Sequence, residues 1–291
     1  MQKIRSGTLA ALLLGSIITP TFSLAAPADS DAIRQAALKD EVAWDFTEGL
    51  TTEVGPRPAG TPQEARARDW AVAKLKMLGF RNVRAEPYNM PVWQRVHDEA
   101  RVTSPFPQNL VVAALGNSGS TGEQGVEGEI VYFPSIADLQ AAPDGSLTGK
   151  IAFVSHDMVA AQDGAGYGYY GAARRQGPSI AAKKGAIAIL VKSIGTDHHR
   201  IAHTGVQMWA EGVTPIPAVA VSVPDAEQLA RMVARAKPVR VHLTAVSRTL
   251  ADQPSGNVIA EIPGSDPKAG VVVAACHLDS WDQGTGAIDD A

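Results

Sequence analysis

One imidazole and four carboxylates lie within fourteen positions, in the stretch HLDSWDQGTGAIDD at residues 277–290. A neutral imidazole such as that of His277 binds transition metals through one nitrogen when an acceptor holds the other. Asp279 is well placed to be this acceptor, which would fix the tautomer without contacting the metal. Asp289 follows the turn QGTG, and a carboxylate that returns to the strand end can bridge two ions. The residue types therefore predict part of a metal site.

The spacing alone leaves a second interpretation open. An H-x-D pair arises often by chance, and Asp-rich loops are commonly turns. The adjacent pair Asp289 and Asp290 concentrates negative charge, which is unfavourable unless cations are close. On spacing alone, a metal site and a plain acidic turn are about equally favoured.

The elements around this stretch predict how it is held. The run VVVAAC before His277 has no polar alternation, which is typical of a central parallel strand covered on both faces. Catalytic groups of open α/β sheets collect beyond the carboxyl ends of such strands. GNVIAEIPG at 256–264 predicts another buried strand. Cys276, the single cysteine of the sequence, is expected to be a small buried thiol at the strand end.

The part after the N-terminus predicts helices. An amphipathic helix is expected over residues 30–50. A second helix is expected to begin with Thr61 as N-cap and Pro62 at the first helical position, with Glu64 reaching back. Gly79 is a natural C-cap, and a strand candidate, NVRAEPYNMPV, follows it. This order predicts an α/β domain.

From about residue 98, short strands predominate, which indicates a compact strand-rich module inserted into the α/β domain. The predicted strands are NLVVAAL, GEIVYF, KIAFVS, AIAILV, PAVAVS and VRVHLTAVS, and the two predicted helices are PSIAAKKG and PDAEQLARMVARAKP. We therefore expect a signal peptide at 1–25, an α/β domain beginning at 26–97, an inserted module at 98–250, and the α/β domain resumed at 251–291.

Composition and the N-terminus limit the partners. The 291 residues are 45% hydrophobic and 19% charged with a net charge of −4, so nothing favours binding to nucleic acid or an anionic membrane. MQKIR, an apolar run and SLAAPADS have the plan of a cleavable signal peptide, and the apolar run is too short for a membrane span. A buried N-terminal helix is the alternative. We expect a secreted or periplasmic protein.

Three other candidates rank lower. His198, His199 and His203 suit a loop better than a metal site, because no HExxH glutamate lies between them. The glycine-rich stretch GAGYGYYG lacks the Lys-Ser/Thr pair of a phosphate-binding loop. His156 and Asp157 follow a predicted strand and are interpreted as turn residues.

The stretch HLDSWDQGTGAIDD resembles the first metal-ligand segment of the co-catalytic zinc exopeptidases, a family that includes bacterial aminopeptidases and glutamate carboxypeptidases. With Ser280, Trp281 and Asp282, it is most similar to the carboxypeptidase Q branch. The resemblance runs from about residue 35 to the end. HTGVQMW, IPAVAVSVPDAEQLARM and KKGAIAILVKS are similar to the protease-associated domain of that branch, and VGPRPAGT is similar to its N-terminal segment.

The resemblance implies a fold, a reaction and roles for residues. The fold would be α/β, a partial mixed-sheet zinc-exopeptidase domain with an inserted β-rich α+β protease-associated domain. His277 would bind one of two zinc ions, Asp279 would orient His277, and Asp289 would bridge both ions. A dizinc-activated water would hydrolyse a terminal peptide bond of a small peptide or dipeptide, and a homodimer is possible.

The sequence also departs from the family pattern. The family uses a Glu-Glu pair, a further acidic ligand and a final His, and these would come after Ala291. We therefore expect this chain to be C-terminally truncated and inactive by itself, although its parent would be a metallo-exopeptidase. The alternative is a non-catalytic peptide-binding or scaffold remnant that uses the protease-associated domain. Whether it is an aminopeptidase, a carboxypeptidase or a dipeptidase does not follow from these residues.

Overall fold

The computed structural model describes residues 30–235 and 237–287, so the predicted signal peptide, Asp289 and Asp290 lie outside the described residues. The chain divides into two compact units, Met1–Asp45 and Phe46–Ala291. None of the helices in the described ranges is long and apolar enough to cross a membrane.

The helix predicted over residues 30–50 is divided in two. Helix α1 spans Ser30–Ala37, and helix α2 spans Val42–Gly49. The Asp40 carboxylate accepts a hydrogen bond from the backbone N–H of Val42 at 2.6 Å. Because a carboxylate in this position satisfies an N–H at a helix start, Asp40 begins a new helix where the periodicity alone predicted a continuous one.

Two helical elements lie near the start of the second unit. A π-helix, η1 (Leu50–Val54), precedes helix α3 (Pro62–Met77). The predicted start of α3 is confirmed, because Thr61 is its N-cap and its Oγ1 accepts from the N–H of Glu64 at 3.3 Å. Gly79 follows the end of the helix with a φ of 85°, a left-handed conformation that suits glycine.

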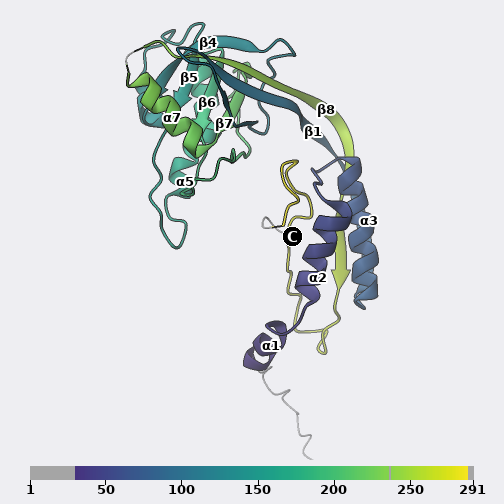
Figure 1. The fold of residues 1–291 in the computed structure, drawn as a ribbon. Helices are drawn as coiled ribbons and strands as arrows, with labels where there is room; N and C mark the ends of the chain where they lie inside the picture. The colour runs from purple at the N-terminus through teal and green to yellow at the C-terminus, as the bar shows by residue number, and fades with distance from the viewer. Residues whose placement is uncertain (1–29, 236, 288–291) are drawn as a thin grey trace, which may run out of the picture. The chain divides into compact units, whose positions relative to one another are not determined.

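The strands form one eight-stranded mixed sheet in the order β2-β1-β8-β4-β5-β6-β7-β3 (Figure 1). The pairs β4–β5, β5–β6 and β6–β7 are parallel, and the other pairs are antiparallel. The predicted mixed α/β class is confirmed. The strands are β1 (Arg81–Ser104), β2 (Gln108–Leu110), β3 (Val112–Ala114), β4 (Val126–Phe133), β5 (Ile151–Val154), β6 (Ala188–Lys192), β7 (Ala218–Val221) and β8 (Arg240–Glu261).

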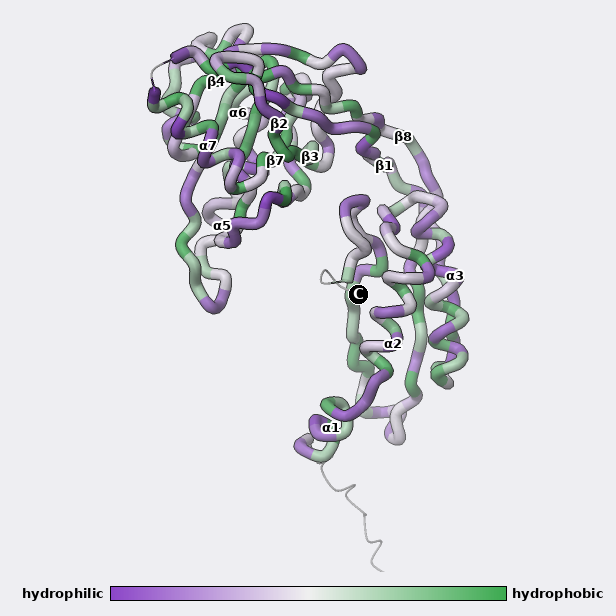
Figure 2. Tube along the Cα trace, in the orientation of Figure 1, coloured by the Kyte–Doolittle hydropathy of each residue, from purple (hydrophilic) through white to green (hydrophobic). Residues whose placement is uncertain are grey.

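The core lies on both faces of the parallel strands. Successive residues of β5 alternate between two clusters: Phe153 packs with Leu229 of α7 (Val223–Val233), and Val154 packs in the cluster that contains Leu139 of α4 (Ile136–Ala141). Side chains alternate across a strand, so a run that is apolar throughout is buried on both sides. Figure 2 shows hydrophobic residues gathered along these strands.

Two further helices lie in this part of the chain. Helix α5 spans Tyr167–Tyr170, and helix α6 spans Ala172–Lys183. Helix α6 begins before the predicted PSIAAKKG helix and includes most of it. Of the four helices among the described residues between β4 and β8, sequence periodicity had indicated only α6 and α7.

Strands β1 and β8 pair antiparallel along most of their length and run side by side (Figure 1). The pairing is interrupted at four places, one of them between Arg95 and His97. Such irregularities bend a strand and increase its twist. The sequence had predicted separate short strands here, because Pro, Gly and Asp interrupt the apolar pattern within β8.

Three predictions near the end of the chain are wrong. The run VVVAAC forms no strand, and Val271, Val272 and Val273 are 89%, 97% and 81% exposed. GNVIAEIPG lies partly in β8, but there it pairs antiparallel with β1 and is not fully buried. Cys276 is exposed rather than buried. A strand needs a neighbour to satisfy its backbone groups, and no described segment pairs with residues 270–277.

Candidate active site

The structure brings His277 and Asp279 together. The Nδ1 atom of His277 lies 2.8 Å from the backbone carbonyl oxygen of Asp279 and 3.5 Å from its carboxylate Oδ1. The nearer acceptor is therefore the main chain and not the side chain named by the sequence prediction. With a hydrogen bond from Nδ1–H to a carbonyl, the imidazole has the orientation and tautomer typical of a zinc ligand.

The described residues supply only part of a metal site. They contain no group of three or more His, Cys, Asp or Glu side chains that could hold a metal ion. Asp289 lies outside the described residues, so its predicted role as a bridging ligand stays a prediction. His277 and its acceptor fit one zinc ligand with its orienting group, and the remaining donors are not among the described side chains.

A buried arginine, missed by the sequence analysis, holds the acidic segment, which we define as residues 277–287. Arg57 is fully buried in the loop VGPRPAGT. Its Nε donates to the carbonyl of Leu278 at 2.6 Å, and its Nη1 donates to the carbonyl of Thr285 at 2.7 Å. Burial lowers the pKa of Arg57, and the nearby charge of Asp279 acts in the opposite direction.

Backbone contacts accompany the guanidinium. The N–H of Arg57 donates to Oγ of Ser280 at 3.0 Å, and the N–H of Ser280 donates to the carbonyl of Arg57 at 3.2 Å. Leu278 packs against the cluster formed by Leu50, Val54 and Ala67. The loop before α3 and the acidic segment are thus joined by polar and apolar contacts.

A second arginine holds the same segment from strand β1. Arg95 Nε lies 2.8 Å from Oδ2 of Asp282, and Arg95 Nη1 lies 2.7 Å from Oδ2 of Asp98. The same Nη1 donates to the carbonyl of Ala114 at 2.7 Å. This ion-pair network connects the acidic segment to β1 and to the end of β3.

Trp281 of the acidic segment packs closely against the backbone at Gly116. A Cβ atom added to Gly116 would lie 2.8 Å from Cη2 of Trp281 and 3.2 Å from Cγ2 of Val206. Glycine is therefore required at position 116 for the indole to approach the backbone. No sequence pattern identified this contact, because its partners are far apart along the chain.

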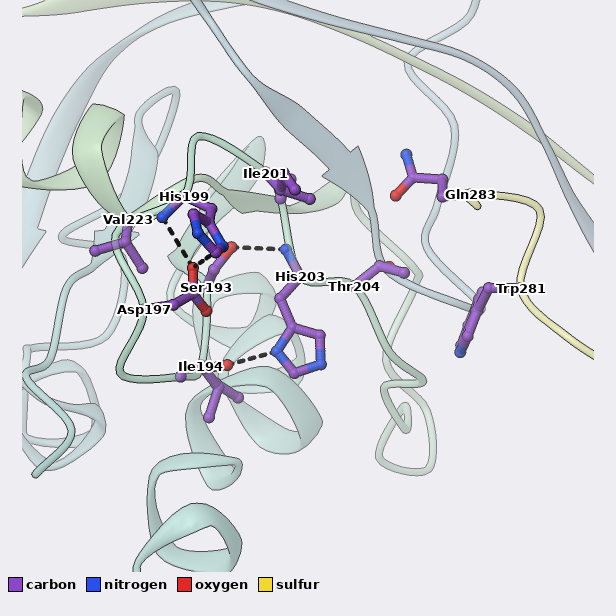
Figure 3. Close-up of a pocket in the computed structure, with 12 residues that line it drawn as sticks. Ser193, Ile194, Asp197, His199, Ile201, His203, Thr204, Val223, Trp281 and Gln283 are labelled. Atoms are coloured by element: carbon purple, nitrogen blue, oxygen red, sulfur yellow. Dashed lines mark hydrogen bonds and ion pairs between the residues drawn. The ribbon is translucent and has the colours of Figure 1, made fainter. Parts of the chain in front are cut away.

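A cavity of about 340 Å³ lies beside the acidic segment (Figure 3). Trp281 and Gln283 line it on one side, and residues that follow β6 line it on the other. The backbone N–H of His203 donates to Oγ of Ser193 at 2.9 Å, and His203 Nδ1 bonds to the carbonyl of Ile194. The lining residues are Ser193, Ile194, Gly195, Asp197, His199, Ile201, Ala202, His203, Thr204, Val223, Trp281 and Gln283.

Comparisons with known proteins give the family of this chain. Residues 257–291 match the sequence profile of peptidase family M28. The chain is 35% identical to carboxypeptidase Q of Bos taurus over 245 residues, which cover 83% of this chain and 50% of that protein. The crystal structure of a peptidase M28 precursor from Shewanella amazonensis has a TM-score of 0.86 at 48% identity, over 89% of this chain and 59% of that chain. The chain belongs to the M28 peptidase family.

A solved structure of lower sequence identity shares the fold. A zinc aminopeptidase from Bacillus subtilis has a TM-score of 0.58 at 20% identity, covering 85% of this chain and 53% of that chain. Carboxypeptidase Q of Homo sapiens is 33% identical over 241 residues, which cover 83% of this chain and 50% of that protein. The chain thus spans about half the length of the curated relatives it matches. The resemblance inferred from HLDSWDQGTGAIDD is confirmed at the level of the family.

The histidines that the sequence analysis ranked below His277 lie in two places in this M28 chain. His199 and His203 line the cavity, and His199 lies 3.6 Å from the carboxylate of Asp197. His156 was interpreted as a turn residue, but the structure has no turn there, and the side chain is 6% exposed and stacks on Tyr170 at 5.3 Å between ring centroids. Burial, with a smaller contribution from Lys192, lowers the pKa of His156. The strand end at His156 is therefore a packed position.

The neighbouring Asp157 has a charge partner. Its carboxylate lies 2.8 Å from Nζ of Lys192, whose side chain is buried, and this contact lowers the pKa of Asp157. Glu227 of α7 lies 3.5 Å from the same Nζ. This cluster neutralises a buried lysine at the carboxyl ends of β5 and β6, so it has a structural explanation without a ligand.

Proposed function

We propose that the protein is a zinc-dependent exopeptidase that hydrolyses terminal peptide bonds of small peptides. In this chain His277 and Asp289 would hold the metal, with Asp289 shared between two ions, and Asp279 would orient His277. The observation that supports the proposal most directly is the hydrogen bond of 2.8 Å between His277 Nδ1 and the Asp279 carbonyl, within the residues that match the M28 profile.

The residues of this chain have distinct tasks in the proposal. The acceptor at Asp279 holds the proton on Nδ1 of His277, so that Nε2 is the nitrogen with the lone pair for metal binding. The Asp279 carboxylate, 3.5 Å from Nδ1, favours this orientation electrostatically. Zinc, when bound, would lower the pKa of a water molecule and polarise the scissile carbonyl.

The cavity beside the acidic segment is the proposed place for part of the substrate. Its volume, about 340 Å³, is at the lower end of the range for small-molecule sites, which suits a dipeptide or another short peptide. Trp281 supplies an apolar part of the lining, and Ser193 and Thr204 also line the cavity. The names of the relatives, carboxypeptidase Q and zinc aminopeptidase, differ in the terminus they imply, so the proposal extends to exopeptidase activity only.

Several related expectations belong to the same proposal. Residues 1–25 are a signal peptide of a secreted or periplasmic protein, and residues 98–250 are a protease-associated domain inserted between 26–97 and 251–291. A homodimer is compatible with the family resemblance.

Metal content and peptidase activity test the proposal together. The protein produced from its complete gene is purified as wild type and as the variants His277→Ala and His97→Ala. His97→Ala is the control, since the His97 imidazole on β1 is 54% exposed. We expect zinc and release of amino acids from dipeptides in the wild type and in His97→Ala, and loss of both in His277→Ala. A wild type that binds no zinc and hydrolyses no peptide would refute the proposal.

A non-catalytic peptide-binding protein is the second candidate. The cavity beside the acidic segment, which could hold a short peptide without a metal ion, favours it. In that case the wild type would bind short peptides at the cavity without zinc and without hydrolysis, and Trp281→Ala would weaken this binding. The two candidates therefore differ in the zinc content of the purified wild type.

A further inference from the structure

Arg57 contacts the acidic segment at both of its ends. The carbonyl of Leu278, next to His277, accepts from Nε at 2.6 Å. The carbonyls of Thr285 and Gly286 accept from Nη1 and Nη2 at 2.7 Å and 3.1 Å. A single guanidinium thus fixes the start of the segment relative to its end, and the main chain between them forms a closed loop.

Only an arginine can make this set of contacts. The guanidinium is planar and presents five N–H donors in a fixed fork, whereas a lysine ammonium is a compact point charge. Arg57 also donates through Nη1 to the carbonyl of Gly55 at 3.2 Å, within its own loop. Arg57 is fully buried, so carbonyls that lost these donors would have few solvent molecules to replace them.

The rest of the loop leaves the guanidinium little freedom. Gly286 has a φ of 68°, and a Cβ atom there would lie 2.5 Å from Cβ of Ser280 and 2.9 Å from Nη1 of Arg57. Ser280 accepts a hydrogen bond from the backbone N–H of Arg57 through its Oγ, and its own N–H donates to the carbonyl of Arg57. The shape of the segment is therefore matched to the arginine, and a side chain at position 286 would displace one or the other.

We propose that Arg57 is a positioning residue, which sets the main-chain path of residues 278–286 and thereby the placement of His277 for metal binding. The second half of this statement rests on the proposed metal-binding role of His277. Metal ligands must be held to within a fraction of an ångström, and the groups that hold them strongly affect metal affinity. Arg57 acts on His277 through the backbone, so its effect is independent of any contact with the substrate.

The test uses two readouts on the protein produced from its complete gene. The first is amide hydrogen exchange of residues 278–286, compared with the buried strand β6. The second is zinc affinity, measured by competition with a chelator. Arg57→Ala and Arg57→Lys should each raise exchange in the segment by about tenfold or more, and should weaken zinc binding by about 10- to 100-fold. Added guanidinium should restore part of both in Arg57→Ala, whereas methylammonium should not.

Two control variants make the result specific. Arg66→Ala removes another arginine of the same region, which donates to the carbonyl of Val54 at 3.2 Å, and should change neither readout. Gly286→Ala keeps the charge of Arg57 but crowds its guanidinium, and should change both. Gly286→Ala also tests the proposal if Arg57→Ala does not fold.

Three outcomes would overturn the inference. Wild-type behaviour of Arg57→Lys would show that a point charge is sufficient. Faster exchange with unchanged zinc affinity would make Arg57 a purely structural residue. Unchanged exchange in Gly286→Ala and in the Arg57 variants would show that these contacts do not fix the segment. Failure of the proposed function is recognised separately, because His277→Ala would then leave zinc affinity unchanged while the exchange results for Arg57 stood.

Discussion

Replacing Arg95 and Asp282 singly and together would measure how firmly the acidic segment is attached to strand β1. Two contacts join the side chains, Nε to Oδ2 at 2.8 Å and Nη2 to Oδ1 at 3.4 Å. The Arg95 side chain is 7% exposed and the Asp282 side chain is 36% exposed. Exposed ion pairs contribute about 0.2–1 kcal/mol, and hydrogen bonds to charged groups contribute about 1.5–3 kcal/mol. A pair with one buried partner should lie between, at a coupling free energy of about 1–2 kcal/mol.

The single substitutions should differ strongly in their effects. Arg95→Met also removes the partner of Asp98, which is 5% exposed, and breaking a buried ion pair costs about 3–5 kcal/mol. The N–H of Ala114 still donates to Asp98 at 2.7 Å, so we expect a value near the lower end, about 3 kcal/mol. Asp282→Asn keeps the shape of the side chain and should lower the free energy of unfolding by about 1–2 kcal/mol.

Equilibrium urea unfolding of the wild type, both single variants and the double variant gives the coupling directly. Glu123→Gln, at an exposed carboxylate in another loop, is the control and should add to Arg95→Met without coupling. Repeating the cycle in concentrated salt should reduce the coupling only in part, since Arg95 is shielded from solvent. A coupling below about 0.3 kcal/mol, within the error of additivity, would refute the reasoning.

Two further predictions concern the strands that support the cavity. The pKa of His156 is lowered by burial, so its contribution to stability is present above the unfolded pKa of about 6.5 and is lost as the pH falls below it. The melting temperature of the wild type should therefore fall between about pH 7.5 and pH 5.5 more than that of His156→Phe, which keeps the stacking on Tyr170; equal falls would contradict this. Phe153→Ala removes a fully buried side chain of β5 and should lower the free energy of unfolding in urea by about 3–5 kcal/mol. A loss below about 1 kcal/mol would mean that the neighbouring side chains fill the space left by the phenyl ring.

Local signals were sufficient where the structure depends on neighbours in sequence. Thr61 and Pro62 predicted the start of α3, because a cap acts within one turn. The central strands β5 and β6 were predicted from apolar runs, which are typical of strands buried on both faces. The class of the fold followed from the order of these elements.

Contacts between distant segments could not be predicted in this way. VVVAAC has the composition of a buried strand, but a strand also needs a partner, and its three valines are exposed in the structure. The sequence analysis assigned no role to Arg57, because its acceptor Leu278 is 221 residues away. The sequence prediction named the Asp279 carboxylate as the acceptor for His277, but the nearer acceptor is the Asp279 carbonyl, a group that every residue carries and no sequence pattern marks.

The two arginines hold different parts of the acidic segment, and this difference separates two functions. Arg57 binds main-chain carbonyls near the start and near the end of the segment, and one of them, that of Leu278, is adjacent to His277. Among the described residues of the segment, Arg95 contacts the side chain of Asp282, which lies between Trp281 and Gln283, the two residues of the segment that line the cavity. Loss of Arg95 should therefore displace the cavity wall while the main chain around His277 stays bound to Arg57. In the proposed enzyme, Arg95 affects substrate binding first and Arg57 affects metal binding first, because each acts on the group nearest to it.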